Sequence, residues 1–189
     1  MFVILIIQDS PASITGHFRR PPVKTLTDHL ANYASYHRDR RNVATHFVGI
    51  PLIVLGIVVL LSRPTFNLAG LPLSPAIVLT GLALAYYFAL DLFFALVMTA
   101  LFALALWLGV WSAKLPTPLW SAIGVGGFFI GWVIQFIGHV YEGRKPAFFD
   151  DIASLLIGPL FVVAEAMFLL GLLGGLRSAI EERAGPLRA

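Results

Sequence analysis

Long apolar runs dominate the hydrophobic pattern of the chain. Each run is close to the roughly 20 apolar residues that a helix needs to cross a bilayer, and polar or Pro/Gly-containing breaks separate them: 43–62, 73–90, 92–111, 119–141 and 152–173. Asp91 alone separates the second run from the third, and Gly158-Pro159 interrupts the last, where proline can break a helix. The pattern predicts an all-α integral membrane bundle of four to five spans.

A segment of different character precedes the first run. Apolar and aromatic residues recur at helical spacing over 26–40: Leu26, Leu30, Tyr33 and His37. Thr25 and Asp28 have the spacing of a capping box, and Asn42 is a residue type that caps helices. We therefore predict an amphipathic helix over 26–40 on the membrane surface, followed by a new helix that Asn42 caps.

The same pattern divides the chain into three parts. Residues 1–24 form an N-terminal leader that ends near Pro21-Pro22 and lacks the basic start and cleavage site of a signal peptide. Residues 25–176 form one membrane-embedded domain, and 177–189 form a polar C-terminal tail. We expect the chemistry to lie in the middle part.

Composition supports the membrane class and limits the chemistry. Hydrophobic residues make up 58% of the chain and charged residues 12%, well below the quarter that is typical of soluble domains. There is no cysteine, which excludes disulfides, thiolate-bound zinc and a cysteine nucleophile. A metal would therefore have nitrogen and oxygen ligands.

The net charge of +3 comes from basic residues that cluster near helix ends. Several precede the first span: Arg19, Arg20, Lys24, Arg38, Arg40 and Arg41. By the positive-inside tendency they place the N-terminal region in the cytoplasm. We interpret them as topology signals and contacts to anionic lipid, so no nucleic-acid partner is expected.

Two histidines lie on either side of the start of the first span. His37 and His46 are nine residues apart, so on one straight helix they would point about 180° apart, at about 100° per residue. A break at 40–42 would let the two imidazoles face each other across a corner. The spacing thus predicts that they converge at the membrane face.

A second polar cluster ends the fourth run. Gln135, His139 and Glu142 follow i, i+4, i+7 spacing and share one helix face, which continues back through Gly131 and Gly127. The glycines would let another helix approach closely. Ionisable residues at the end of a membrane helix are costly without partners, so the two clusters together predict a metal site.

Each of these residues also has a structural interpretation. A single histidine at the membrane edge can be a hydrogen-bonded interfacial residue, and Gln135 can bond a neighbouring helix. Glu142 can form a salt bridge with Arg144 or Lys145 at the helix end. The metal interpretation therefore depends on the clustering of the residues.

Two motifs carry a resemblance to a known family. They are Tyr33-x-x-x-His37 followed by Asn42-x-x-x-His46-x-x-Gly49-Ile50-Pro51, and Trp132-x-x-Gln135-Phe136-Ile137-Gly138-His139-x-x-Glu142-Gly143-Arg144-x-Pro146-Ala147. The stretch from 26 to 161 resembles the 2-hydroxy fatty acid dioxygenase family, which in yeast acts in sphingolipid (phytosphingosine) breakdown. The resemblance implies an iron(II)-dependent (Fe2+) membrane enzyme that shortens 2-hydroxy fatty acids by one carbon through α-oxidation.

The resemblance also implies roles for individual residues. The family's histidines correspond to His37, His46 and His139, and Glu142 is a candidate fourth ligand. In the mechanism that we expect, Arg41 or Arg144 pairs with the carboxylate of a long-chain 2-hydroxy fatty acid. Further candidates for substrate binding are Gln135 and Tyr33. Dioxygen would bind beside the substrate, whose acyl tail would lie among the apolar helices.

The residues alone also allow two other classes of protein. A zinc-dependent membrane lipid hydrolase would use similar ligands without dioxygen, and a non-enzymatic membrane protein would use its histidines for packing or pH response. Haem binding is disfavoured because axial histidines normally face each other within a bundle. The Ala/Leu/Gly/Arg-rich composition suggests a bacterial inner-membrane protein with its site at the cytoplasmic face, or an endoplasmic reticulum protein in a eukaryote. The oligomeric state stays open.

Overall fold

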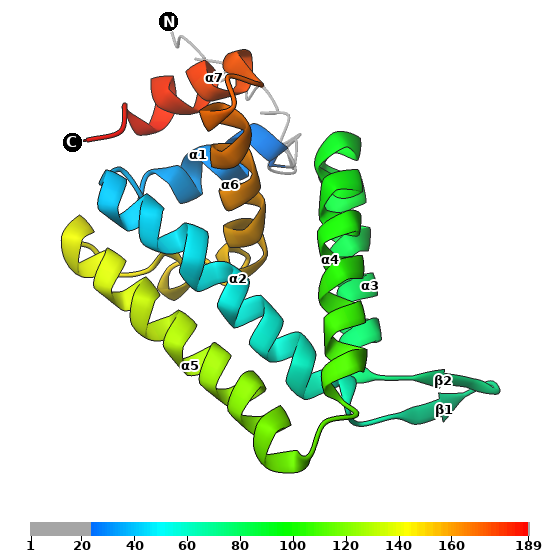
Figure 1. Cartoon of the computed structure of the whole chain (residues 1–189). Coiled ribbons are helices and arrows are strands. Elements are labelled where there is room, and N and C mark those ends of the chain that lie inside the picture. The colour runs from blue at the N-terminus through cyan, green and yellow to red at the C-terminus, as the bar shows by residue number, and fades with distance from the viewer. Residues whose placement is uncertain (1–23, 189) are drawn as a thin grey trace, which may run out of the picture.

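The computed structural model describes residues 24–188, so the predicted leader lies almost wholly outside the described residues. Figure 1 shows helices arranged around one long pair, with a small hairpin at one end. The elements in chain order are α1 (Leu26–Ala34), α2 (Arg40–Ser62), β1 (Phe66–Leu68), β2 (Leu71–Leu73), α3 (Pro75–Leu90), α4 (Leu92–Ser112), α5 (Thr117–Glu142), the 3-10 helix η1 (Ala147–Phe149), α6 (Ser154–Leu169) and α7 (Gly174–Ala184).

Three helices within residues 24–188 are long and apolar enough to cross a membrane, namely α2, α4 and α5. Two predicted spans are shorter: α3 and α6 have 16 residues each, or about 24 Å at 1.5 Å per residue, against a hydrocarbon core of about 30 Å. Pro159 lies inside α6 without ending it, and α7 follows at an angle of 118°. The all-α membrane class is confirmed, with three full-length spans or four if α6 and α7 count as one.

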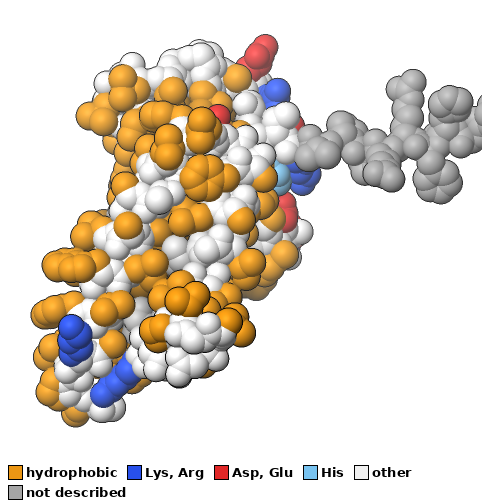
Figure 2. Space-filling model, turned by 90° about the vertical axis from the view of Figure 1, so that its right-hand side faces the viewer, with side chains coloured by type: hydrophobic (Ala, Val, Ile, Leu, Met, Phe, Trp, Pro, Cys, Tyr) orange, Lys and Arg blue, Asp and Glu red, His pale blue; other side chains and the backbone are white. Residues whose placement is uncertain are grey.

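The outer surface agrees with this class. Large apolar side chains point outward along the long helices, for example Val48, Phe129 and Val140, which are 52%, 62% and 77% exposed. Figure 2 shows hydrophobic side chains over most of one face, with charged ones gathered toward its edges. Such a surface matches lipid in the middle and water or headgroups at the rim.

The helices α2 and α5 lie side by side and form the most extensive packing of the described chain (Figure 1). Glycine makes this approach possible, as predicted for Gly131. A Cβ there would lie 2.8 Å from the Gly49 carbonyl oxygen and 2.9 Å from the Ile53 nitrogen. Gly127 meets α2 at ordinary contact distance, whereas Gly56, which was not predicted to matter, has Phe128 N 2.7 Å from its ideal Cβ position. Close backbone contact thus fixes the register of the two helices.

The start of the domain differs from the prediction in one respect. The capping box of Thr25 and Asp28 is confirmed, but α1 ends at Ala34, and the break falls at residues 35–39, hereafter the connector. The predicted cap Asn42 was wrong. Asp39 caps α2, because its extended backbone and its carboxylate, which accepts from Arg41 N at 2.8 Å, satisfy the helix start.

Candidate metal centre

Three histidines meet where the connector, α2 and α5 come together. One ring nitrogen from each of His37, His46 and His139 lies within 4.8 Å of the others. Ring centroids are 4.4 Å apart for His37 and His46, 5.0 Å for His37 and His139, and 5.2 Å for His46 and His139. The side chains are 0%, 1% and 7% exposed. The break before α2 thus lets the two N-terminal histidines converge, as their spacing predicted.

Hydrogen bonds fix the orientation of two of the imidazoles. His37 Nδ1 lies 2.6 Å from the Tyr33 carbonyl oxygen, and His46 Nδ1 lies 2.8 Å from the Asn42 carbonyl oxygen. A carbonyl oxygen can only accept, so each Nδ1 carries the proton and each Nε2 presents a lone pair. Metal-bound histidines are held in this way by their second nitrogen.

The polar atoms left over point to a missing partner. Among residues 24–188, His37 Nε2 and His139 Nδ1 are buried without a hydrogen-bond partner, although buried polar atoms are normally paired. Burial, with a smaller effect from the neighbouring His46, lowers the pKa of His37 well below its usual value, so its imidazole is neutral. Neutral imidazoles with free lone pairs are ligands for a divalent transition metal, so the donor set fits a metal ion.

Aromatic residues hold the His37 ring from one side. The Tyr33 ring stacks on it at a centroid distance of 4.1 Å, and Phe161 of α6 lies 5.0 Å from Tyr33 and 5.6 Å from His37. Tyr33, predicted as a substrate-binding residue, therefore contacts both His37 and the cavity described below. Packing from α6 was not evident in the sequence, because no spacing relates Phe161 to the histidines.

Glu142 lies beside the histidines but outside the group of converging nitrogens. One carboxylate oxygen accepts hydrogen bonds from the backbone N–H groups of Arg38 and Asp39, at 2.9 and 2.8 Å, and from the Asn42 amide at 3.1 Å. The other accepts from the Arg188 guanidinium. The carboxylate thus holds the connector against α5, and its cation is Arg188 rather than Arg144 or Lys145.

The two arginines proposed to bind a carboxylate lie elsewhere. Arg41 pairs with Asp39 at 2.8 Å, stacks over Tyr141 and is 61% exposed at its side chain. Arg144 donates to the Ser35 carbonyl oxygen at 2.8 Å and lies over the Tyr36 ring. Neither lines the cavity beside the histidines.

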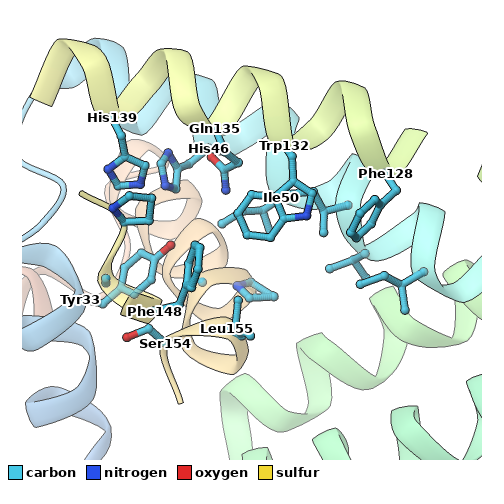
Figure 3. A pocket seen from close by; sticks show the side chains of 17 residues that line it. Tyr33, His46, Ile50, Phe128, Trp132, Gln135, His139, Phe148, Ser154 and Leu155 are labelled. Carbon is cyan, nitrogen blue, oxygen red and sulfur yellow. The ribbon is translucent and has the colours of Figure 1, made fainter. Parts of the chain in front are cut away.

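An apolar cavity of about 340 Å³ extends from His46 and His139 between α2, α5 and α6. Its lining on α5 is one helix face, and Figure 3 shows His139 and Gln135 near His46, with Trp132 and Phe128 progressively farther along. The lining on α2 is also one face: His46, Ile50, Ile53, Val54 and Ile57. Each row spans eleven residue steps, or about 16 Å of helix at 1.5 Å per residue. The cavity is therefore long and apolar, with polar groups gathered at one end.

Gln135 lines the same cavity as His139, one helical turn earlier on α5. It is 6% exposed, and its Oε1 has no hydrogen-bond partner within the described chain. Phe148 of η1 and Leu155 of α6 also line the cavity, and no motif in the sequence indicated them. Phe128, Trp132, Gln135 and His139 follow i, i+4, i+7, i+11 spacing, which would have indicated the α5 side.

These features define a class: an integral membrane helical protein with a buried three-histidine centre at the head of an apolar cavity. A family model described as "2-hydroxy-palmitic acid dioxygenase Mpo1-like" matches residues 23–170. The 2-hydroxy-palmitic acid dioxygenase MPO1 of Saccharomyces cerevisiae is 31% identical over 158 residues, covering 82% of this chain and 87% of the yeast protein. This chain belongs to the Mpo1-like family, which confirms the resemblance. No solved structure matches it.

Proposed function

We propose that this protein is a dioxygenase that converts a long-chain 2-hydroxy fatty acid to the fatty acid one carbon shorter. The name of the yeast relative supports the reaction and the substrate class. The observation that carries the proposal is the meeting of three converging imidazoles at one end of an apolar cavity, where His46 and His139 line the cavity wall. A fatty acid with polar groups at C1 and C2 has the same division into a reactive head and an apolar tail.

We propose iron(II) as the metal, held by His37, His46 and His139. Three neutral nitrogen donors on a divalent ion leave coordination positions open, as oxygen-dependent iron enzymes require. Iron bound there would supply the redox chemistry that couples dioxygen reduction to cleavage of the C1–C2 bond. We assign Glu142 to positioning, because four hydrogen-bond donors already occupy its carboxylate.

The cavity would bind the acyl tail. A C–C bond of about 1.5 Å in a zigzag chain advances about 1.25 Å per methylene, so the length of about 16 Å between His46 and Ile57 accommodates about 13 methylenes. Each buried methylene contributes about 0.8 kcal/mol. Substrates with tails near that of 2-hydroxypalmitate therefore make full use of the cavity.

Gln135 is the residue that we assign to the polar head of the substrate. Its amide can donate to a carboxylate and accept from a hydroxyl, and it lies one helical turn before His139. Arg41 and Arg144 do not suit this role, because they bond Asp39 and the Ser35 carbonyl oxygen and neither lines the cavity. Arg41 at the start of α2 and Arg144 just after α5 are instead placed to contact lipid headgroups.

The basic residues around the connector support a location at the cytoplasmic face of the membrane. Arg38, Arg40 and Arg41 lie around the start of α2, and Arg144 follows the end of α5, so this end of the bundle carries more basic residues than the opposite end, where Arg63 and Lys114 follow α2 and α4. We propose the inner membrane if the protein is bacterial, and the endoplasmic reticulum if it is eukaryotic. A zinc-dependent hydrolase is not favoured, because the family match is to a dioxygenase.

An oxygen-consumption assay tests the proposal. The full chain, purified anaerobically in detergent with iron(II), receives 2-hydroxypalmitate and then air. We expect oxygen uptake coupled to formation of pentadecanoate, measured by mass spectrometry. Palmitate, which lacks the hydroxyl, serves as the control substrate and should give no product. An iron-loaded protein that consumes no oxygen and releases no shortened acid would refute the proposed reaction.

A further inference from the structure

The connector that carries His37 is held by backbone hydrogen bonds to a residue of another helix. Glu142 accepts from the N–H groups of Arg38 and Asp39, the two residues after His37. Glu142 itself lies three residues after His139 on α5. One carboxylate therefore ties the histidine of the connector to the histidine of α5.

A second segment holds the connector from the other side. Residues Gly185–Arg188, hereafter the tail clip, lie along it as a short parallel β-bridge between Asp39 and Arg188. Arg188 N donates to the Arg38 carbonyl oxygen at 2.6 Å, and Arg40 N donates to the Arg188 carbonyl oxygen at 3.3 Å. The Arg38 guanidinium donates to the Gly185 carbonyl oxygen at 2.7 Å. Two backbone hydrogen bonds and one from the Arg38 side chain thus join the tail clip to residues 38–40.

The side chain of Arg188 completes this arrangement. Its guanidinium pairs with the Glu142 carboxylate, whose side chain is 1% exposed, while the Arg188 side chain itself is 61% exposed. A buried carboxylate without a cation is unfavourable and tends to move toward water. Arg188 therefore helps to keep Glu142 in the position where it holds the connector.

The tail clip is anchored by a helix that lies beyond the family match. The match ends at residue 170, whereas α7 covers Gly174–Ala184 and packs against α1. Ile180 of α7 is 2% exposed, and Arg183 pairs with the exposed Asp28. The clip is thus placed by packing that is independent of the histidines.

We propose that the tail clip, through Arg188, positions His37 relative to His139 and thereby sets the affinity and geometry of the metal centre. The inference rests on the proposed metal centre. Arg188 is a positioning residue, because it acts through Glu142 and the connector rather than through any contact with the metal or substrate. Mutation of a residue that orients a metal ligand typically lowers metal affinity or activity by 10–100-fold.

Anaerobic titration of the full-length protein with Co(II) tests this inference. Cobalt reports both the dissociation constant and, through its visible absorption bands, the ligand geometry. Arg188→Ala and Arg188→Gln should weaken Co(II) binding by about 10–100-fold and alter the spectrum. Arg188→Lys, which keeps the charge, should restore most of the affinity and the wild-type bands. Arg177→Ala, which removes an exposed ion pair with Glu181 inside α7 and leaves the clip and its contacts with α1 in place, is the matched control and should change neither.

The outcomes separate the two claims. Wild-type protein that binds no Co(II) would overturn the metal centre, and the inference with it. Wild-type protein that binds Co(II), with Arg188→Gln and Arg188→Lys equal to it in affinity and spectrum, would overturn the inference alone. If Arg188→Ala does not fold, as judged by size-exclusion chromatography in detergent, the comparison of Arg188→Gln with Arg188→Lys still tests whether Arg188 positions the metal centre.

Discussion

Blocking the acyl cavity at Val54 should shift the chain-length preference of the enzyme. Val54 lies on α2 and lines the cavity eight residues after His46 and three before Ile57, which is the last α2 residue of the lining. Val54→Trp would fill the cavity at that level. The head of the cavity, where His46 and His139 lie, would remain open to the carboxylate and the hydroxyl.

The size of the effect follows from the helix geometry. The three residues from Val54 to Ile57 cover about 4.5 Å, which corresponds to about four methylenes at roughly 1.25 Å each. At about 0.8 kcal/mol per methylene, the lost burial is about 3 kcal/mol for 2-hydroxypalmitate. A ten-carbon 2-hydroxy acid does not reach that level and should lose little. The ratio of kcat/KM values for the C16 and C10 substrates should therefore fall by roughly a hundredfold.

The assay is a competition between the two 2-hydroxy acids, with both shortened products quantified by mass spectrometry. Val48→Trp is the matched control, because Val48 lies on the same helix but is 52% exposed and does not line the cavity. It should leave the substrate ratio unchanged. An unchanged ratio in Val54→Trp, with the protein folded and active, would show that the tail does not lie in this cavity.

Further predictions concern packing and metal dependence. Gly131→Ala should lower the unfolding free energy by about 1–3 kcal/mol, because the new methyl group would meet backbone atoms of α2 at 2.8 and 2.9 Å; thermal unfolding in detergent measures this. Gly126→Ala, with no atom within 4 Å of its Cβ position, should be neutral or slightly stabilising, and equal losses in both variants would contradict the packing argument. A chelator should abolish oxygen uptake, and iron(II) should restore it while zinc(II) should not. Restoration by zinc would argue for hydrolytic rather than oxygen-dependent chemistry.

Much of the architecture follows from hydrophobic periodicity. Apolar runs of membrane length predicted the helical class, and the nine-residue spacing of His37 and His46 required a break that the structure contains. The shared face of Gln135 and His139 also follows from helix periodicity, since local geometry alone determines it. These features depend on residues close in sequence.

The missed features depend on contacts between distant segments. Both Asp39 and Asn42 are good capping residues; Asp39 caps α2, whereas the Asn42 amide lies inside the bundle and donates to Glu142. The pairing of Glu142 with Arg188 joins residues 46 positions apart, so no helical spacing could indicate it. Arg41 likewise forms an ion pair with Asp39 and does not line the cavity. Tertiary packing selects among partners that the sequence leaves equivalent.

Iron content after anaerobic loading tests whether the three histidines share one metal ion. We expect about one iron(II) per wild-type chain after removal of free metal, and a large loss in each of His37→Ala, His46→Ala and His139→Ala, because the three imidazoles bind the same ion. His29→Ala is the control: His29 lies on α1, outside the converging group, and its variant should retain the metal. Iron retained at the wild-type level in all three cluster variants would contradict a shared metal centre.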